Sequence, residues 1–213
     1  MTTFAYQGPT RGLDRAVLLA HGAGTDLDAA PLRVVADALA DAKIPSLRFN
    51  YPYKDRGGKA PARPPVLLDA TRAAVAELAR RTKLPTDRLV IGGRSMGGRY
   101  CSLVAGAEDD PLPVRGLLLL GYPLHAAGKP EKARDDHFRR LTMPVLFVSG
   151  TRDALASQPD LRKAARKVKG PVAWCWLDAP DHGFRPLKSS GNTLDDALTA
   201  AAEATVAWVR ALP

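Results

Sequence analysis

The sequence has little of several features that define other classes of protein. It holds only two cysteines among 213 residues, too few for a disulfide framework, and aromatic residues make up only 6%. No segment approaches the roughly 18 consecutive apolar residues that a membrane helix needs. The N-terminal segment lacks the basic and apolar regions of a secretory signal. We therefore expect a cytoplasmic protein with no membrane partner.

The remaining composition is that of an ordinary globular domain. Hydrophobic residues make up 46% of the chain and charged residues 25%. Because domains commonly reach roughly 250 residues, we expect one domain over residues 1–213. The composition leaves the oligomeric state open.

Positive charge is the unusual feature of the composition. Lys and Arg number 31 against 22 Asp and Glu, which gives a formal net charge of +9. Nucleic-acid grooves combine such charge with aromatic side chains or with a reading helix. Aromatic residues are scarce here, and the densest basic run, residues 162–170, alternates with alanine and valine at helical spacing. We expect a solvated helix face there and no nucleic-acid partner.

Apolar segments of strand length alternate along the chain with amphipathic segments of helical length. The predicted strands cover residues 15–20, 46–49, 88–92, 114–120, 144–149 and 171–177, with a short additional strand near residues 3–6. The predicted helices cover residues 31–42, 66–81, 97–107, 161–168 and 194–212. This alternation indicates an α/β protein, with a mostly parallel sheet of about six to seven strands and helices on both faces. Sites in this architecture form where strands end and helices begin.

The motif G-x-S-x-G occurs at one of these junctions. Gly93, Ser95 and Gly97 lie between the predicted strand 88–92 and the predicted helix 97–107. In this context the motif forms a sharp turn that exposes a nucleophilic serine. The start of the helix supplies N–H groups and positive potential where an oxyanion would form. We predict that Ser95 is a nucleophile.

A serine hydroxyl is a weak nucleophile unless a base takes its proton. His182 follows the last predicted strand and Asp153 follows the strand before it, so both come after Ser95 in the order typical of this turn. We predict that His182 is the base and that Asp153 holds its imidazole in the correct tautomer. Asp178 and Asp181, in the histidine's own loop, are competitors for that role.

A second turn, His21-Gly22-Ala23-Gly24, ends the first core strand. Its glycines allow the backbone to bend so that the N–H of Ala23 points at the serine. With the N–H of Met96 it would form an oxyanion hole with two donors. A base at His21 would precede the serine in the wrong order, so we favour a loop-bracing role for this side chain.

The other histidines and the cysteines show no pattern of a metal site or a second nucleophile. His125 and His137 lack metal-ligand spacing, and we interpret them as surface or loop residues. Cys101 lies on the predicted helix 97–107 and Cys175 on the last predicted strand. We interpret both as buried packing residues. The sequence has no P-loop and no dinucleotide-binding fingerprint after its first strand, so we expect no metal and no cofactor.

Several residues near the predicted serine turn are candidates for contact with substrate. They are His21, Gly24, Arg56, Arg63, Arg94 and Tyr122. Arg56 and Arg63 lie in the irregular segment 50–65, which leaves a strand at the end where a site would form. With Arg94 and Arg99 they predict positive potential and a preference for anionic or polar acyl groups. The alternatives are that Arg94 and Arg99 form structural ion pairs and that the segment is a solvated loop.

In order and context, these features resemble the α/β-hydrolase fold over essentially the whole chain. The resemblance rests on the turn at residues 21–24, the elbow at residues 93–97, Asp153 and His182. It implies a serine hydrolase, with nucleophile, acid and base carried over onto Ser95, Asp153 and His182.

Within that fold, three segments resemble a small, cap-less group of hydrolases related to dienelactone hydrolases. They are GGRSMGGR (92–99), PVLFVSGTRD (144–153) and DHGF (181–184). The sequence departs from dienelactone hydrolase itself, whose nucleophile is a cysteine, and from dehalogenases and epoxide hydrolases, which use an aspartate. Hydrolases with lids usually insert them where this chain has only residues 122–143, so we expect no cap domain.

We therefore predict a serine hydrolase, and favour a carboxylesterase that acts on small soluble acyl substrates. Thioesterases, peptidases and acyltransferases share the same acyl-enzyme chemistry and remain alternatives. Some eukaryotic relatives of the resembled group serve in protein complexes, so a non-catalytic interaction protein is a further alternative.

Overall fold

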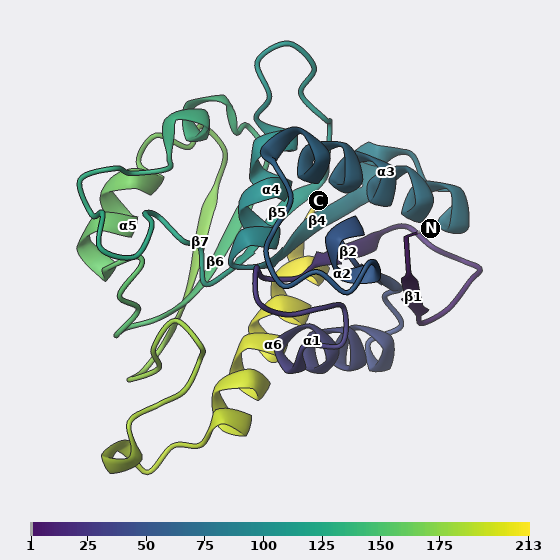
Figure 1. The fold of residues 1–213 in the computed structure, drawn as a ribbon. Coiled ribbons are helices and arrows are strands. Elements are labelled where there is room, and N and C mark those ends of the chain that lie inside the picture. Colours follow the sequence, from purple (N-terminus) through teal and green to yellow (C-terminus); the bar gives the residue numbers. More distant parts are fainter. Residues whose placement is uncertain (1) are drawn as a thin grey trace.

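Residues 2–213 form one seven-stranded sheet with helices on both faces in the computed structural model of the chain (Figure 1). The strands are β1 Phe4–Gln7, β2 Ala16–Ala20, β3 Ser46–Phe49, β4 Leu89–Arg94, β5 Gly116–Leu120, β6 Val145–Gly150 and β7 Val172–Leu177. The helices are α1 Ala30–Asp41, α2 Pro52–Asp55, α3 Pro64–Thr82, α4 Met96–Ala105, α5 Gln158–Ala165 and α6 Leu194–Ala211. The predicted α/β architecture, with its short additional strand, is confirmed.

The order of the strands, β1-β3-β2-β4-β5-β6-β7, places β2 next to β4 near the middle of the sheet. Neighbouring strands run parallel except β1, which pairs antiparallel with β3. From β2 the chain extends the sheet toward β3, then returns to β4 and builds in the other direction. Ligand sites of open α/β sheets lie at such a switch point, outside the carboxyl ends of the strands.

Helices cover both faces of the sheet, which explains why its central strands are continuously apolar. Every residue of β2 and of β5 is buried. Helices α3, α4 and α5 pack on one face, and α1 and α6 pack on the other (Figure 1). In α1 the buried residues Leu32, Val35, Ala36 and Leu39 recur at helical spacing and form one apolar stripe.

The segment between β5 and β6 is where a lid would be inserted. Within the described chain it contains a short 3₁₀ helix, Asp136–Arg140, and no additional domain. The cap-less architecture is therefore confirmed. Segment 50–65, expected to be irregular, contains the single turn of α2 before α3 begins.

The two cysteines lie in different surroundings. Cys101 is buried on α4, where its thiol contacts the carbonyl oxygen of Gly92 at 3.3 Å, and burial raises its pKa. Cys175 is only half-buried on β7, so the expectation that both are buried is corrected for this residue. Both are free thiols. None of the helices within residues 2–213 combines the length and apolarity needed to cross a membrane.

His137 forms a buried polar pair with Ser102 of α4. The Oγ of Ser102 donates to the carbonyl oxygen of Arg99 at 2.7 Å, so Nε2 of His137 donates to that Oγ at 2.8 Å. Burial, with the nearby charges of Arg99 and Arg140, lowers the pKa of His137 to about 4. His125 is also buried. His125 lies in a loop, as expected, but the burial of both histidines was not expected, because it depends on packing against distant segments.

The pH dependence of stability tests the His137 environment. His137 stays neutral in the folded protein down to pH of about 4, whereas in the unfolded chain it takes up a proton below about 6.5. The contribution of neutral His137 to the free energy of unfolding is therefore complete above pH of about 6.5 and is lost as the pH falls toward 4. We expect His137→Gln to shrink the difference in unfolding free energy between pH of about 7 and about 4.5 by roughly 2 kcal/mol, measured by urea unfolding.

The lowered pKa of His21 contributes to the same pH dependence in both proteins and cancels in this comparison. Equal pH slopes for the wild type and His137→Gln would contradict the buried neutral state of His137.

Candidate active site

Ser95 lies in a strained turn between β4 and α4. Its backbone has φ 49° and ψ −113°, a region that residues other than glycine rarely adopt. Gly93 and Gly97 on either side of it press against Ala20 at the end of β2, and a Cβ added at either glycine would overlap the Ala20 carbonyl oxygen. The N–H of Ser95 donates to the carbonyl oxygen of Leu120 at 2.9 Å. The glycines of the motif are thus needed for close contact between strand and helix.

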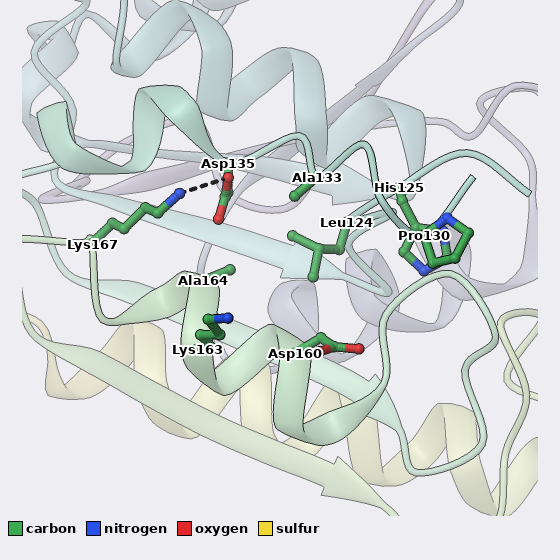
Figure 2. Close-up of a pocket in the computed structure, with 9 residues that line it drawn as sticks. All are labelled: Leu124, His125, Pro130, Ala133, Asp135, Asp160, Lys163, Ala164 and Lys167. Atoms are coloured by element: carbon green, nitrogen blue, oxygen red, sulfur yellow. Dashed lines mark ion pairs between the residues drawn. The ribbon is translucent and has the colours of Figure 1, made fainter.

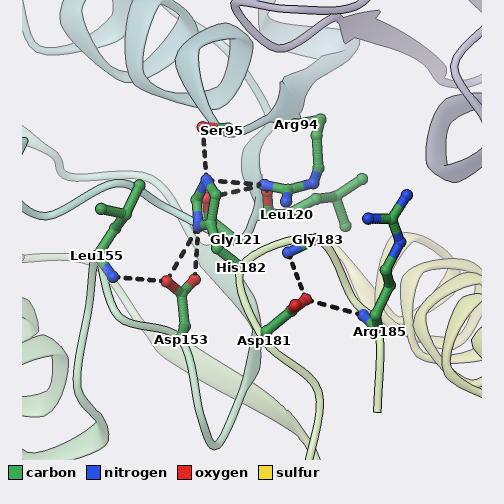
Figure 3. A network of polar contacts seen from close by, with 10 residues as sticks. All are labelled: Arg94, Ser95, Leu120, Gly121, Asp153, Leu155, Asp181, His182, Gly183 and Arg185. Carbon is green, nitrogen blue, oxygen red and sulfur yellow. Dashed lines mark hydrogen bonds and ion pairs between the residues drawn. The ribbon is translucent and has the colours of Figure 1, made fainter. Parts of the chain in front are cut away.

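The structure brings Ser95, His182 and Asp153 into one line of hydrogen bonds (Figure 3). The Oγ of Ser95 lies 2.9 Å from Nε2 of His182. On the other side of the imidazole, Nδ1 lies 2.8 Å and 3.0 Å from the two carboxylate oxygens of Asp153. Because a carboxylate only accepts, Nδ1 carries the proton and Nε2 is left to accept from the serine hydroxyl. Asp153 is buried, with 3% of its surface exposed.

Backbone N–H groups brace the loops that carry Asp153 and His182. After β6, the N–H of Leu155 donates to Oδ1 of Asp153 at 2.8 Å. After β7, Oδ1 of Asp181 accepts from the N–H groups of Gly183 and Arg185 at 2.7 and 3.0 Å (Figure 3). Asp181 therefore stabilises the loop turn, and Asp153 is the carboxylate that contacts His182.

The predicted oxyanion donors lie on two braced segments. Nδ1 of His21 donates to the carbonyl oxygen of Gly22 at 2.7 Å, and Nε2 accepts from the N–H of Tyr51 at 3.1 Å. The Gly22 carbonyl and the Ala23 N–H belong to one planar peptide and point in opposite directions. His21 therefore fixes the direction of the Ala23 N–H. The hydroxyl of Tyr53 donates to the Ala23 carbonyl oxygen at 2.7 Å and fixes the next peptide.

Met96 is the first residue of α4. The first N–H groups of a helix have no acceptor within the helix, and the helix dipole adds positive potential there. The Met96 N–H follows directly on Ser95, so it is available beside the serine hydroxyl. Together with Ala23 it provides backbone donors without any charged side chain.

Two cavities meet at Ser95. One, of about 560 Å³, lies between α1 and α6 and is mostly apolar, with Pro31 and Leu198 in its walls; we name it the α1–α6 cavity. The other, of about 470 Å³, lies against α3 and α4 and includes Leu67 and Tyr100; we name it the α3–α4 cavity. Ser95, Ala23 and Leu155 line both cavities. A molecule whose reacting group lies at Ser95 can therefore extend in either direction.

Of the residues expected to contact substrate, Gly24 and Arg94 line the α1–α6 cavity. Arg94 is 8% exposed, and its Nη1 lies 3.3 Å from the carbonyl oxygens of both Leu120 and Gly121 and 3.5 Å from Nε2 of His182 (Figure 3). Its guanidinium lies 4.8 Å from the ring centre of Phe184. Burial lowers the pKa of Arg94 to about 10. The Arg94 guanidinium therefore mainly contacts backbone carbonyls and an aromatic ring of the protein, and it forms no ion pair with residues 2–213.

The other expected contacts are corrected by the structure. Arg56 and Arg63 are exposed and line neither cavity, because their neighbours on the same segment, such as Pro64, form the wall instead. Tyr122 is fully buried, and its hydroxyl donates to the carbonyl oxygen of Arg134 at 2.5 Å. His21 is also fully buried and lines neither cavity, which agrees with its bracing role.

Sequence reasoning missed several residues that form the cavity walls. Leu155 lies two residues after Asp153, Leu198 belongs to the closing helix, and Arg134 comes from the segment between β5 and β6. Only Leu155 could have been found, from its place beside the predicted acid. Within residues 2–213 no group of three or more His, Cys, Asp or Glu is placed to hold a metal ion.

A parallel sheet whose central strand ends in a strained serine turn, with a histidine and an acid at later strand ends, defines the α/β-hydrolase class. The sequence agrees with this class. Residues 13–210 match the family described as "Alpha/beta hydrolase domain", and the chain belongs to that family.

Solved structures share this fold at low sequence identity. Est1E from Butyrivibrio proteoclasticus, with bound ferulic acid, superposes with a TM-score of 0.72 at 17% identity, covering 98% of this chain and 96% of its own. A dienelactone hydrolase from Anabaena variabilis gives 0.71 at 18% identity, with coverages of 99% and 92%. A lid-less serine hydrolase from Xanthomonas campestris gives 0.69 at 17% identity, with coverages of 100% and 91%. At these identities the likeness concerns the fold.

Replacing Gly97 tests the contact that shapes the serine turn. We expect Gly97→Ala to lower the unfolding free energy by about 3 kcal/mol, because the added Cβ overlaps the Ala20 carbonyl. Gly24→Ala is the matched control for stability, since an added Cβ there meets nothing within 4 Å. Urea unfolding measures both variants. Similar stabilities of the two would contradict the tight packing at Gly97.

Proposed function

We propose that the protein hydrolyses esters of small acyl groups through an acyl-enzyme at Ser95. The observation that carries this proposal is the line from Ser95 Oγ to His182 Nε2 at 2.9 Å and from His182 Nδ1 to Asp153 at 2.8 Å. A nucleophile paired with a base that is itself oriented by an acid is the arrangement needed to activate a hydroxyl at neutral pH.

In this mechanism Ser95 Oγ attacks the ester carbonyl carbon while Nε2 of His182 takes the hydroxyl proton. The same imidazole then returns the proton to the departing alcohol. Water attacks the acyl-enzyme by the reverse sequence and releases the acid. Asp153 holds the Nδ1 proton in place and stabilises the imidazolium formed at each step.

Negative charge on the carbonyl oxygen in the transition state is stabilised by the N–H groups of Ala23 and Met96. His21 is a positioning residue for the first of these donors, because it binds the Gly22 carbonyl of the same peptide. Tyr53 positions Ala23 from the other side, because it binds the carbonyl of the peptide that follows. Such donors are effective because they are already oriented before the charge develops.

Membership of the hydrolase family and the esterases of similar fold support an ester as the bond cleaved. Cavities of about 560 and 470 Å³ that open beside Ser95 support small substrates. Ferulic acid bound in Est1E also supports a small acid. Thioester, amide and acyl-transfer chemistry would use the same residues, and a substrate panel distinguishes them.

A fluorophosphonate probe tests the nucleophile. We expect one covalent adduct on Ser95 and none in Ser95→Ala, with hydrolysis of short p-nitrophenyl esters reduced by at least about 10⁴-fold in Ser95→Ala and in Asp153→Asn. Ser102→Ala is the matched control, because Ser102 also contacts a histidine but is buried. It should retain labelling. The absence of an adduct on Ser95 in the folded wild-type protein would contradict the proposed hydrolase and favour the non-catalytic alternative.

Tyr53→Phe tests the positioning of the Ala23 peptide. Loss of the hydroxyl frees the Ala23 carbonyl, so we expect kcat for a short ester to fall roughly 10-fold with KM changed less than about 2-fold. Steady-state kinetics separate the two parameters. An unchanged kcat would assign Tyr53 to packing alone.

A further inference from the structure

The α3–α4 cavity differs from the α1–α6 cavity in the charge of its walls. Arg99, on the first turn of α4, and Arg134, between β5 and β6, both line it beside Ser95. No carboxylate of the described chain, residues 2–213, lines this cavity. Two arginines therefore line an otherwise largely apolar space that opens directly onto the serine.

Neither guanidinium forms a hydrogen bond or an ion pair with any group of residues 2–213. Nε of Arg99 is buried without a hydrogen-bond partner. The guanidinium of Arg99 lies 5.6 Å from the ring centre of Tyr100, its one aromatic contact within the described chain. This differs from Arg94, whose donors are directed at backbone carbonyls. The two arginines thus keep donors available for a bound group.

The carboxylate next to Arg134 in the chain is used elsewhere. Oδ1 of Asp135 forms an ion pair with Nζ of Lys167 at 2.9 Å and lines a separate cavity beside α5 (Figure 2). The chain therefore places its own acid away from the two arginines and neutralises it with a different cation.

Hydrogen bonds hold the backbone of each arginine in place. The N–H of Arg99 donates to the carbonyl oxygen of Ser95 at 3.0 Å. The N–H of Arg134 donates to the carbonyl oxygen of Leu124 at 2.7 Å. The carbonyl oxygen of Arg134 accepts from the hydroxyl of Tyr122 at 2.5 Å. Tyr122, which does not reach the cavity itself, thus helps to place Arg134 in the wall.

Like charges held in a half-buried wall repel each other. Burial and the charge of Arg99 both lower the pKa of Arg134. A bound anion would relieve this repulsion and supply the missing hydrogen-bond acceptors. Carboxylates suit the planar guanidinium, which donates two parallel N–H bonds to their oxygens.

We infer that Arg99 and Arg134 form a carboxylate-binding subsite, and that the substrates are esters bearing a second, free carboxylate. This inference rests on the proposed ester hydrolysis at Ser95 and names the substrate class. The carboxylate would lie in the α3–α4 cavity, and the other side of the ester would extend into the α1–α6 cavity.

Matched esters test the subsite. Monomethyl adipate is compared with methyl adipamate, in which a neutral amide replaces the acyl-side carboxylate. Para-acetoxybenzoate is compared with para-acetoxybenzamide, in which the change lies on the alcohol side. We expect kcat/KM to be at least about 10-fold higher for the anion in one pair, and the pair that shows it identifies which side of the ester enters the cavity.

In Arg99→Gln and Arg134→Gln this preference should fall at least about 10-fold, because each variant removes charge-assisted hydrogen bonds to the carboxylate. Hydrolysis of the neutral esters should change less than about 3-fold. Arg63→Gln is the matched control, since Arg63 is exposed beside the cavity but does not line it, and its preference should equal that of the wild type. Arg99→Lys keeps the charge and should retain more preference than Arg99→Gln.

Binding of adipate to Ser95→Ala, measured by titration calorimetry, tests the subsite without catalysis. Binding that weakens at least about 10-fold on adding Arg99→Gln supports the subsite even if no ester is hydrolysed, an outcome that would overturn only the proposed function. Absence of adipate binding, or a preference below about 2-fold in both ester pairs, would overturn the subsite. A preference that persists in both glutamine variants would also overturn it.

Discussion

Two glycines, Gly93 and Gly97, pack against Ala20 so closely that neither position has room for a side chain. This contact holds the start of α4 against the end of β2 and leaves Ser95 between them at φ 49°. The loop with His21 and Ala23 begins directly after Ala20, so the same contact brings the Ala23 N–H beside the serine. The positions of Ser95 and of the predicted oxyanion donor at Ala23 therefore depend on one close approach of a strand and a helix.

The positions of His182 and Asp153 depend on the rest of the sheet. Because parallel strands end at the same edge, the loops after β6 and β7 deliver Asp153 and His182 to the side of the sheet where Ser95 emerges. The Ser95 N–H bonded to Leu120 ties the turn to β5, between β4 and β6. Bracing within each loop then sets the side-chain directions, as Asp181 does for the histidine's loop.

The arginines that give the chain its positive charge lie in different surroundings in the structure. Exposed arginines such as Arg63 face solvent, where charges are screened and have little influence on a ligand. Arg94 is buried, and its donors are directed at carbonyls beneath the turn. Arg99 and Arg134 line a cavity at Ser95, and none of the carboxylates of residues 2–213 lines it. Burial and local partners, rather than the net charge of +9, decide which arginines are available to an anion.

The alternation of strands and helices, the serine turn and the order of Ser95, Asp153 and His182 could all be predicted from the sequence, because hydrophobic period and turn chemistry are local properties. Which side chains line the cavities depends on the packing of the folded chain. Tyr122 and Arg134 show the reason: the first is buried and the second reaches the cavity because of hydrogen bonds and packing between distant segments. No local pattern encodes such contacts, so the side chains that would select a substrate could not be predicted as the serine turn was.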